Sequence, residues 1–252
     1  MRVNRTKRMR FLFMGTVVLL MMVLTSCLGG EGNTYRITAT TFATVTNNGA
    51  GSYRLFLDEN RGILDPTDDS PINWGDAERV LLQYDIPFAD TITDNTRFKS
   101  IVRSATKVPV VSLIDVTGLE TLPDSLGNDG VVNLDITAYR GYLTIHAIVE
   151  RSRSGKYSLY YSYDTEDFRG DTLNLNLHYL YSDKNSSSSD YVNHLDCAVI
   201  PEFVRNRVVG DSLYVTLSAD MWKDSNKTSK GRVTRCVSVS KRRLIPPTYS
   251  IY

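Results

Sequence analysis

Short runs in which apolar and polar residues alternate dominate the chain from residue 35 onward. Residues 173–179, Leu-Asn-Leu-Asn-Leu-His-Tyr, are the clearest example. A period of two is typical of a half-buried antiparallel strand. Turn clusters such as residues 47–51, Asn-Asn-Gly-Ala-Gly, separate the runs. Helical periodicity is almost absent, so the pattern predicts an all-β protein.

The predicted strands fall into two groups. About five runs between residues 35 and 116, the last of them at 98–104 and 108–116, suit a small closed barrel of the OB type. Residues 117–129 contain turn-forming glycines and a proline, and we expect them to form a linker. Seven or eight runs in 130–252 favour an antiparallel β-sandwich.

The N-terminus has a different pattern. Residues 1–10 carry five basic side chains and no acid, and 14 uncharged residues follow at 11–24. A membrane-spanning helix needs about 20 apolar residues, so this run has the length of a signal-peptide core instead. Residues 1–26 are therefore predicted to be a lipoprotein signal peptide that ends at Leu24-Thr25-Ser26-Cys27, a tetrad that resembles the bacterial lipobox.

Cys27 is accordingly the expected lipidation site. Two acyl chains, such as palmitate, anchor a protein stably where one does not. The glycine-rich residues 27–34 would then form a flexible leash between the lipid and the barrel. We expect a lipid-anchored protein of the bacterial outer membrane. The sequence is compatible with a position on the periplasmic face or on the cell surface.

Removal of the signal peptide changes the charge balance. The whole chain has a formal net charge of +1, but loss of five basic residues leaves 24 basic against 28 acidic residues, a net charge of −4. A mildly acidic protein lacks the basic surface that nucleic acids require. The remaining cysteines, Cys197 and Cys236, would lie in an oxidising compartment. There they could either form a disulfide or remain as two free thiols.

Six segments resemble those of the NigD-like lipoprotein family of the Bacteroides–Prevotella group. In addition to the lipobox, they are Phe42–Val45, Tyr53–Asp58, Gly62–Pro66, Glu78–Tyr84, Val132–Ile136 and Gly141–Ile145. The resemblance covers nearly the whole mature chain, and it implies an N-terminal OB-like domain and a C-terminal β-sandwich domain. It implies a link to a bacteriocin-associated gene cluster and no defined activity.

Residues suited to catalysis or metal binding are sparse. No Gly-x-Ser-x-Gly nucleophile motif is present, and the three histidines have no partner at a metal-ligand spacing. His178 is expected to face solvent and His146 to be packed in a strand. The acidic clusters in 65–76 and 164–171 lack the spacing of a calcium-binding EF-hand, so we expect solvated loops and no metal or cofactor.

A binding surface has better support. OB barrels commonly bind ligands on strands two and three and the adjoining loops. Here this would present Tyr53, Arg54, Phe56 and Trp74, whose rings and guanidinium could stack on a sugar or peptide. The sequence therefore favours a non-enzymatic envelope protein that binds an unknown protein, peptide or glycan. The alternative is an envelope enzyme, such as a glycan hydrolase, that uses scattered carboxylates.

Overall fold

The computed structural model describes most of the chain beyond residue 37. The described ranges are 38–47, 52–59, 61–70, 72–86, residue 93, 96–152, 155–181, 189–223 and 228–245. The predicted signal peptide, Cys27 and the leash lie outside them. Within these ranges, no helix is both long and apolar enough to cross a membrane.

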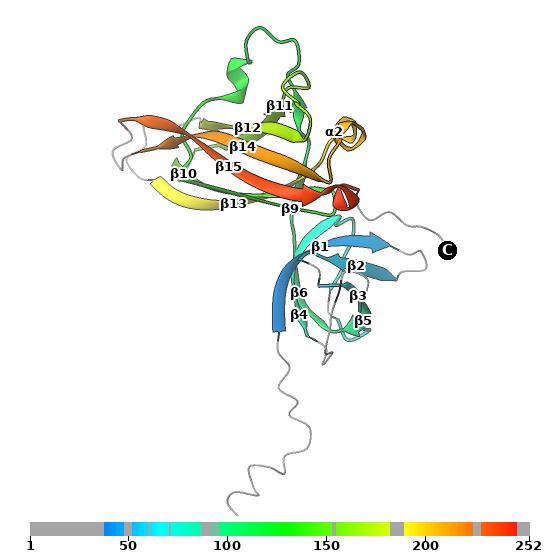
Figure 1. The fold of residues 1–252 in the computed structure, drawn as a ribbon. Helices are drawn as coiled ribbons and strands as arrows, with labels where there is room; N and C mark the ends of the chain where they lie inside the picture. The colour runs from blue at the N-terminus through cyan, green and yellow to red at the C-terminus, as the bar shows by residue number, and fades with distance from the viewer. Residues whose placement is uncertain are drawn as a thin grey trace, which may run out of the picture. The chain divides into compact units, whose positions relative to one another are not determined.

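The first six strands form one sheet in the order β5-β3-β2-β1-β4-β6 (Figure 1). Their bounds are β1 Thr38–Asn47, β2 Tyr53–Leu57, β3 Ile63–Pro66, β4 Arg79–Asp85, β5 Arg97–Ser100 and β6 Val102–Lys107. The edge strands β5 and β6 are separated in the chain by Ile101 alone. One bent stretch of chain thus joins the two edge strands, and the sheet curves into the expected OB-like form of a half-barrel.

Alternation along these strands builds the barrel core. Leu55 and Leu57 of β2, Leu64 of β3 and Val102 of β6 are fully buried. The core also contains Trp74, from the loop between β3 and β4. Gln83 of β4 is exposed at an intervening position, as the period of two requires, whereas Thr44 of β1 and Arg79 of β4 are buried there.

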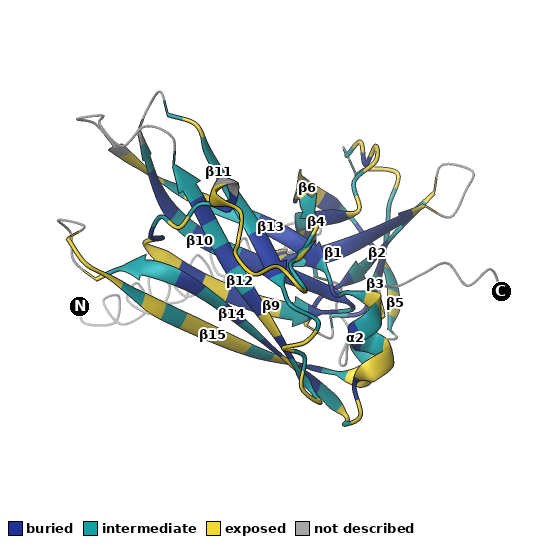
Figure 2. Cartoon of the chain, turned by 90° about the horizontal axis from the view of Figure 1, so that it is seen from above, coloured by how far each residue is buried: buried dark blue, intermediate teal, exposed yellow. Residues whose placement is uncertain are grey.

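The remaining strands form two stacked sheets with the orders β7-β13-β10-β9 and β15-β14-β12-β11-β8 (Figure 2). Their bounds are β7 Val110–Val111, β8 Ile114–Asp115, β9 Asn133–Tyr139, β10 Tyr142–Ser152, β11 Tyr157–Tyr163, β12 Thr172–Tyr181, β13 Ser189–Val199, β14 Ser212–Trp222 and β15 Lys230–Ser240. Their facing sides share one core. The predicted all-β fold, a barrel followed by a sandwich, is confirmed.

Strand β12 shows how the pattern determines burial. Leu173, Leu175, Leu177 and Tyr179 are buried, while Asn174 is exposed. The neighbouring strand β14 runs parallel to β12, so the C-terminal ends of both strands lie at the same end of the sheet. The sandwich sheets are therefore mixed rather than purely antiparallel.

Residues 108–116 differ from the expectation that they complete the barrel. They form β7, which pairs with β13, and β8, which pairs with β11. The segment thus contributes one short strand to each sandwich sheet. Its alternation predicted strands correctly but could not identify their partners, because pairing depends on contacts that are distant in sequence.

A tight hairpin projects from the sandwich to the barrel. Tyr139 and Tyr142 are paired across a two-residue turn, and Arg140 and Gly141 both have positive φ, 47° and 78°. This is the backbone of a type I′ turn, which matches the right-handed twist of antiparallel strands. It brings Arg140 to 5.3 Å from the Phe56 ring of the barrel.

The described residues also contain three short helical segments. They are η1 Asp124–Leu126, α2 Glu202–Arg207 and η2 Lys241–Arg243. Helix α2 follows β13 and buries Val204 in the sandwich core. Turn η1 lies in the predicted linker segment and buries Leu126.

Candidate functional site

The predicted binding face on β2 does not form one surface. Trp74 is only 7% exposed and belongs to the barrel core, with its ring centroid 6.1 Å from that of Tyr53. Arg54 and Phe56 lie at the opposite parity on β2 and point away from that core. The four residues are therefore divided between two faces of the sheet.

Arg54 and Phe56 each have an internal partner. The Nε of Arg54 lies 3.4 Å from Oδ1 of Asp65, and the guanidinium of Arg140 covers the Phe56 ring. The alternation of the three β2 residues was readable in the sequence and would have placed Tyr53 on the opposite face from Arg54 and Phe56. We therefore correct the expectation of a joint binding face there.

Cys197 and Cys236 do not form a disulfide in the structure. Cys197 is buried on β13, where its Sγ lies 3.5 Å from the hydroxyl of Thr144. Cys236 is exposed on β15, in the other sheet of the sandwich. A cysteine that points outward from one sheet cannot meet one that is buried in the other.

The acidic clusters are engaged in local contacts. Asp65 accepts hydrogen bonds from two arginines, Asp76 from Lys107, and Asp171 from the backbone N–H of Gly210. Across the described residues, no group of three or more His, Cys, Asp or Glu side chains could hold a metal ion.

His178 is half-buried, contrary to the expectation that it faces solvent. Its Nε2 lies 2.8 Å from Oγ of Ser162. Burial lowers the pKa of His178 below its ordinary value, and the charge of Arg232 lowers it further. The prediction was wrong because His178 lies on the polar face of β12, which looks solvent-facing in the sequence. In the structure, the segment 122–129 partly covers this face.

A polar row crosses the sandwich interior. Nε2 of His194 lies 2.9 Å from Oδ2 of Asp196, and the Tyr161 hydroxyl donates to the same oxygen over 2.8 Å. The Tyr157 hydroxyl lies 3.3 Å from Nδ1 of His194. Burial raises the pKa of the Tyr161 hydroxyl, as does the charge of Asp196, so Tyr161 stays protonated as the donor.

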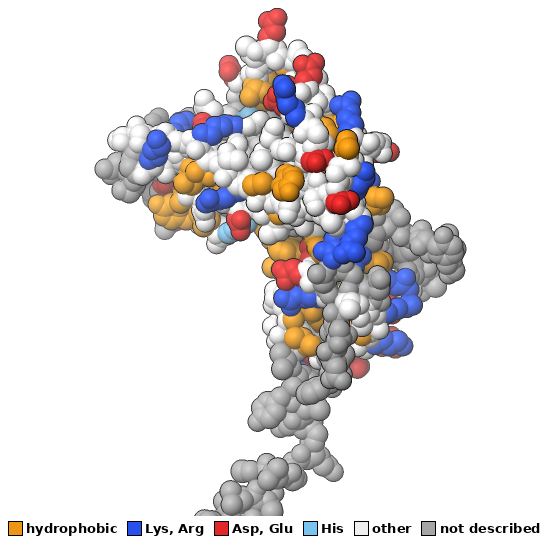
Figure 3. Space-filling model, viewed as in Figure 1, with side chains coloured by type: hydrophobic (Ala, Val, Ile, Leu, Met, Phe, Trp, Pro, Cys, Tyr) orange, Lys and Arg blue, Asp and Glu red, His pale blue; other side chains and the backbone are white. Residues whose placement is uncertain are grey.

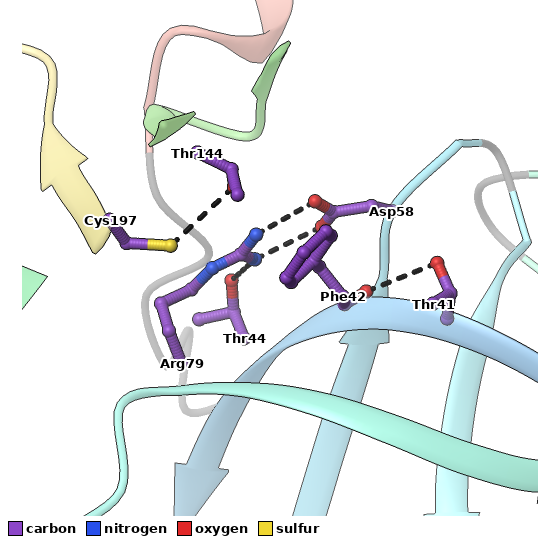
Figure 4. A network of polar contacts seen from close by, with 7 residues as sticks. All are labelled: Thr41, Phe42, Thr44, Asp58, Arg79, Thr144 and Cys197. Atoms are coloured by element: carbon purple, nitrogen blue, oxygen red, sulfur yellow. Dashed lines mark hydrogen bonds and ion pairs between the residues drawn. The ribbon is translucent and has the colours of Figure 1, made fainter. Parts of the chain in front are cut away.

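A buried ion pair lies where the barrel meets the sandwich (Figure 4). The Arg79 guanidinium donates to both carboxylate oxygens of Asp58, over 3.0 and 2.7 Å, and to the Thr44 hydroxyl over 3.0 Å. It also lies 4.9 Å from the ring centroid of Tyr142, whose hydroxyl donates to Glu78 over 2.5 Å. These contacts connect Arg79 of the barrel with Tyr142 of the sandwich.

Two hollows that are lined by described residues of the sandwich have the size of ligand sites. The first, which we call the aromatic hollow, has a volume of about 340 Å³. It is lined by Asn128, Asp129, Gly130, Glu150, Tyr179, Tyr181, Trp222 and Lys230. The second, the polar hollow, has a volume of about 480 Å³, and its lining includes His178, Asp220 and Arg232. Both are lined by Asn128 and Asp129, so the two hollows are neighbours.

The parallel arrangement of β12 and β14 creates the aromatic hollow. Tyr179 and Tyr181 end β12 and Trp222 ends β14, so parallel pairing brings all three rings to one end of the sandwich. The Tyr179 and Tyr181 rings are nearly parallel, with an interplanar angle of 13° and centroids 6.3 Å apart. Figure 3 shows hydrophobic and basic side chains side by side over this end, on the left of the view.

The segment 127–131 forms the wall between the hollows. The Asp129 N–H donates to the carbonyl of Tyr179 over 2.8 Å, and the Asp129 carboxylate accepts from the N–H of Tyr181 over 3.0 Å. A Cβ on Gly130 would lie 2.9 Å from indole atoms of Trp222. Only a glycine lets the backbone lie this close to the ring.

Lys230 and Glu150 complete the lining. Nζ of Lys230 lies 5.4 Å from the Trp222 ring centroid and donates to the Asn128 carbonyl over 2.6 Å. The Tyr179 hydroxyl donates to the Glu150 carbonyl, and burial raises its pKa. The sequence prediction missed this site. The sequence does show an aromatic residue at the end of each of two long strands, Tyr181 in β12 and Trp222 in β14. It does not show that these two strands are neighbours in the sheet.

The fold and these hollows define a class of protein: a two-part β-protein in which an OB-like barrel precedes a sandwich that carries ligand-sized hollows. Solved structures with the same fold come from the Bacteroidales. A protein of unknown function from Bacteroides vulgatus matches with a TM-score of 0.58 and 15% identity, over 85% of this chain and 97% of that one. A toxin-related protein from Parabacteroides distasonis matches with a TM-score of 0.56 and 16% identity, over 82% and 96%.

A NigD-like immunity protein from Bacteroides caccae also shares the fold. Its TM-score is 0.53 at 15% identity, over 77% of this chain and 91% of that one. The family resemblance read from the sequence is therefore matched in the fold. No family model matches the sequence, and no curated protein matches it either.

Proposed function

We propose that this protein is a lipid-anchored, non-enzymatic binding protein of the bacterial cell envelope, and that the aromatic hollow is its ligand site. The observation that carries the binding role is the convergence of Tyr179, Tyr181 and Trp222 on one hollow of about 340 Å³. Hollows with apolar walls and a few convergent polar groups are the usual form of a small-molecule site.

The anchor is supported by the sequence around Cys27. The basic residues 1–10, the short apolar run and the lipobox-like tetrad together favour diacylation at that cysteine. The lipid would hold the protein at the outer membrane, while the barrel and sandwich face the aqueous side.

A role beside a bacteriocin system is the narrower form of this proposal. Two proteins that share the fold are described as an immunity protein and as toxin-related. At 15% and 16% identity, these two proteins support the shared fold, and only their names suggest the role. Identification of the genes that flank this one tests the role directly.

Affinity capture tests the binding role. The mature protein is immobilised, exposed to a detergent-solubilised envelope fraction of the native host, and compared with its Trp222→Ala and Tyr214→Ala variants. Tyr214 is a matched control, because it is an exposed aromatic residue on the same strand, 48% accessible. We expect wild type and Tyr214→Ala to retain the same component and Trp222→Ala to lose it.

Equal retention by all three proteins would contradict the assignment of the hollow. Recovery of a captured glycan in cleaved form would instead favour the alternative, a hydrolase that uses carboxylates, of which the lining residues Asp129 and Glu150 are candidates.

A further inference from the structure

We infer that the aromatic hollow binds a neutral sugar ring, as the terminal or an internal unit of an uncharged glycan. The inference rests on the proposed function, because it names the ligand class for the same site. It depends on four features: the ring faces, the hydrogen-bonding groups, the charge arrangement and the volume.

The ring faces are suited to a sugar. Tyr181 and Trp222 are half-exposed, and the buried Tyr179 supports Tyr181 from behind. A pyranose has an apolar face of C–H groups that packs flat on an aromatic ring. Tyrosine and tryptophan offer such a face at little cost in conformational entropy, and they keep a polar atom at the rim.

The hydrogen-bonding groups around the rings are of both kinds. Asn128 and Lys230 carry donors, while Asn128, Asp129 and Glu150 carry acceptors. Sugar hydroxyls donate and accept at the same time, so a mixed rim matches them.

The charges disfavour an ionic ligand of either sign. The ammonium of Lys230 lies over the Trp222 ring, so its charge would repel an ammonium or guanidinium ligand. An anionic ligand would be repelled by Asp129 and Glu150, two acidic residues of the lining. A neutral ligand with many hydroxyl groups avoids both conflicts.

The volume limits the ligand to a small unit. Ligand pockets span roughly 300–1,000 Å³, and the aromatic hollow, at about 340 Å³, is near the lower limit. One or two sugar rings fit this space. The polar hollow is a separate space on the other side of Asn128 and Asp129.

Calorimetry and tryptophan fluorescence test the inference on the mature protein. The probes are five neutral disaccharides: maltose, cellobiose, lactose, mannobiose and N,N′-diacetylchitobiose. Glucosamine, glucuronic acid and N-acetyl-lysine amide serve as charged probes. Of the two tryptophans, Trp74 is buried in the barrel, so a change in emission reports on Trp222.

We expect at least one neutral disaccharide to bind and to change the Trp222 emission. Removal of a central aromatic contact weakens binding by about tenfold or more. Trp222→Ala and Tyr181→Ala should therefore each lose that much affinity for the sugar, whereas Tyr214→Ala should bind like the wild type. The charged probes should bind more weakly than the best disaccharide.

The inference is overturned if no disaccharide binds, if a charged probe binds more tightly, or if Trp222→Ala binds the sugar as wild type does. The capture experiment separates these outcomes from failure of the binding role. If capture depends on Trp222 and the sugars fail, the site remains and the ligand class is wrong. If both fail, the site itself is wrong.

Discussion

At the scale of single residues, the strongest feature is the buried pair of Arg79 and Asp58. Arg79 is fully buried, and burial raises the pKa of the Asp58 carboxyl, although the hydrogen bonds and charge of Arg79 act in the opposite direction. A buried charge that loses its partner is strongly destabilising, which makes this pair a sensitive point of the barrel.

Asp58→Asn and Arg79→Met should therefore each lower the free energy of unfolding by about 3–5 kcal/mol. The double variant should lose less than the sum of the two, because it leaves no lone buried charge. Chemical denaturation measures both effects. Lys107→Ala, which removes an exposed ion pair with Asp76, should change little. Additive losses in the double variant would show that the two residues do not act as a pair.

His178 makes stability depend on pH. Its pKa in the folded protein is lowered by burial and by Arg232, so the unfolded chain takes up the proton first as the pH falls. The stability that His178 contributes is present above the unfolded pKa of about 6.5 and is lost as the pH falls through the lower folded pKa. His178→Gln should flatten this dependence in unfolding curves between about pH 7 and pH 5. An unchanged slope in the variant would assign the effect to other groups.

At the scale of elements, the segment 127–131 decides the shape of the hollows. It is held by backbone hydrogen bonds to both strands: Asp129 to Tyr179 of β12, and Val131 to Asp220 of β14. Since β12 and β14 pair through residues 172–176 and 214–218, the segment occupies the place where the two strands no longer pair.

Gly130→Ala tests this arrangement. The added methyl would lie 2.9 Å from the Trp222 indole, so the segment or the ring must move. Overpacking of this kind costs about 1–3 kcal/mol, and we expect a lower melting temperature together with a shift in Trp222 emission. Tyr214→Ala provides the reference for a change elsewhere on β14. Unaltered emission would mean that the ring does not contact the segment in solution.

At the scale of the whole molecule, the predicted anchor decides where the protein acts. Cys27→Ser should abolish incorporation of a labelled palmitate analogue and release the protein from the membrane fraction, because both predicted acyl chains are attached at Cys27. Membrane fractionation with immunodetection measures this. Cys236→Ser, at an exposed thiol, is the matched control and should leave the protein on the membrane. Membrane retention of Cys27→Ser would exclude the lipid as the anchor.

Sequence periodicity determined much of the fold. Alternation located most strands and their buried faces, as for Leu173, Leu175 and Leu177, because a residue's side of a strand depends only on its own position. The same local signal indicated a barrel followed by a sandwich. It also contained the parity that separates Tyr53 from Arg54 and Phe56.

Only the tertiary structure decided which strands are neighbours, and with that the candidate site. The parallel pairing of β12 with β14 brings Tyr181 and Trp222 to one end of the sandwich, residues 108–116 join the sandwich sheets, and Cys197 and Cys236 lie in different sheets. The physical reason is common to all three. Strand partners are selected by packing between residues far apart in the chain. A local pattern of apolar and polar residues therefore does not determine which strands pair.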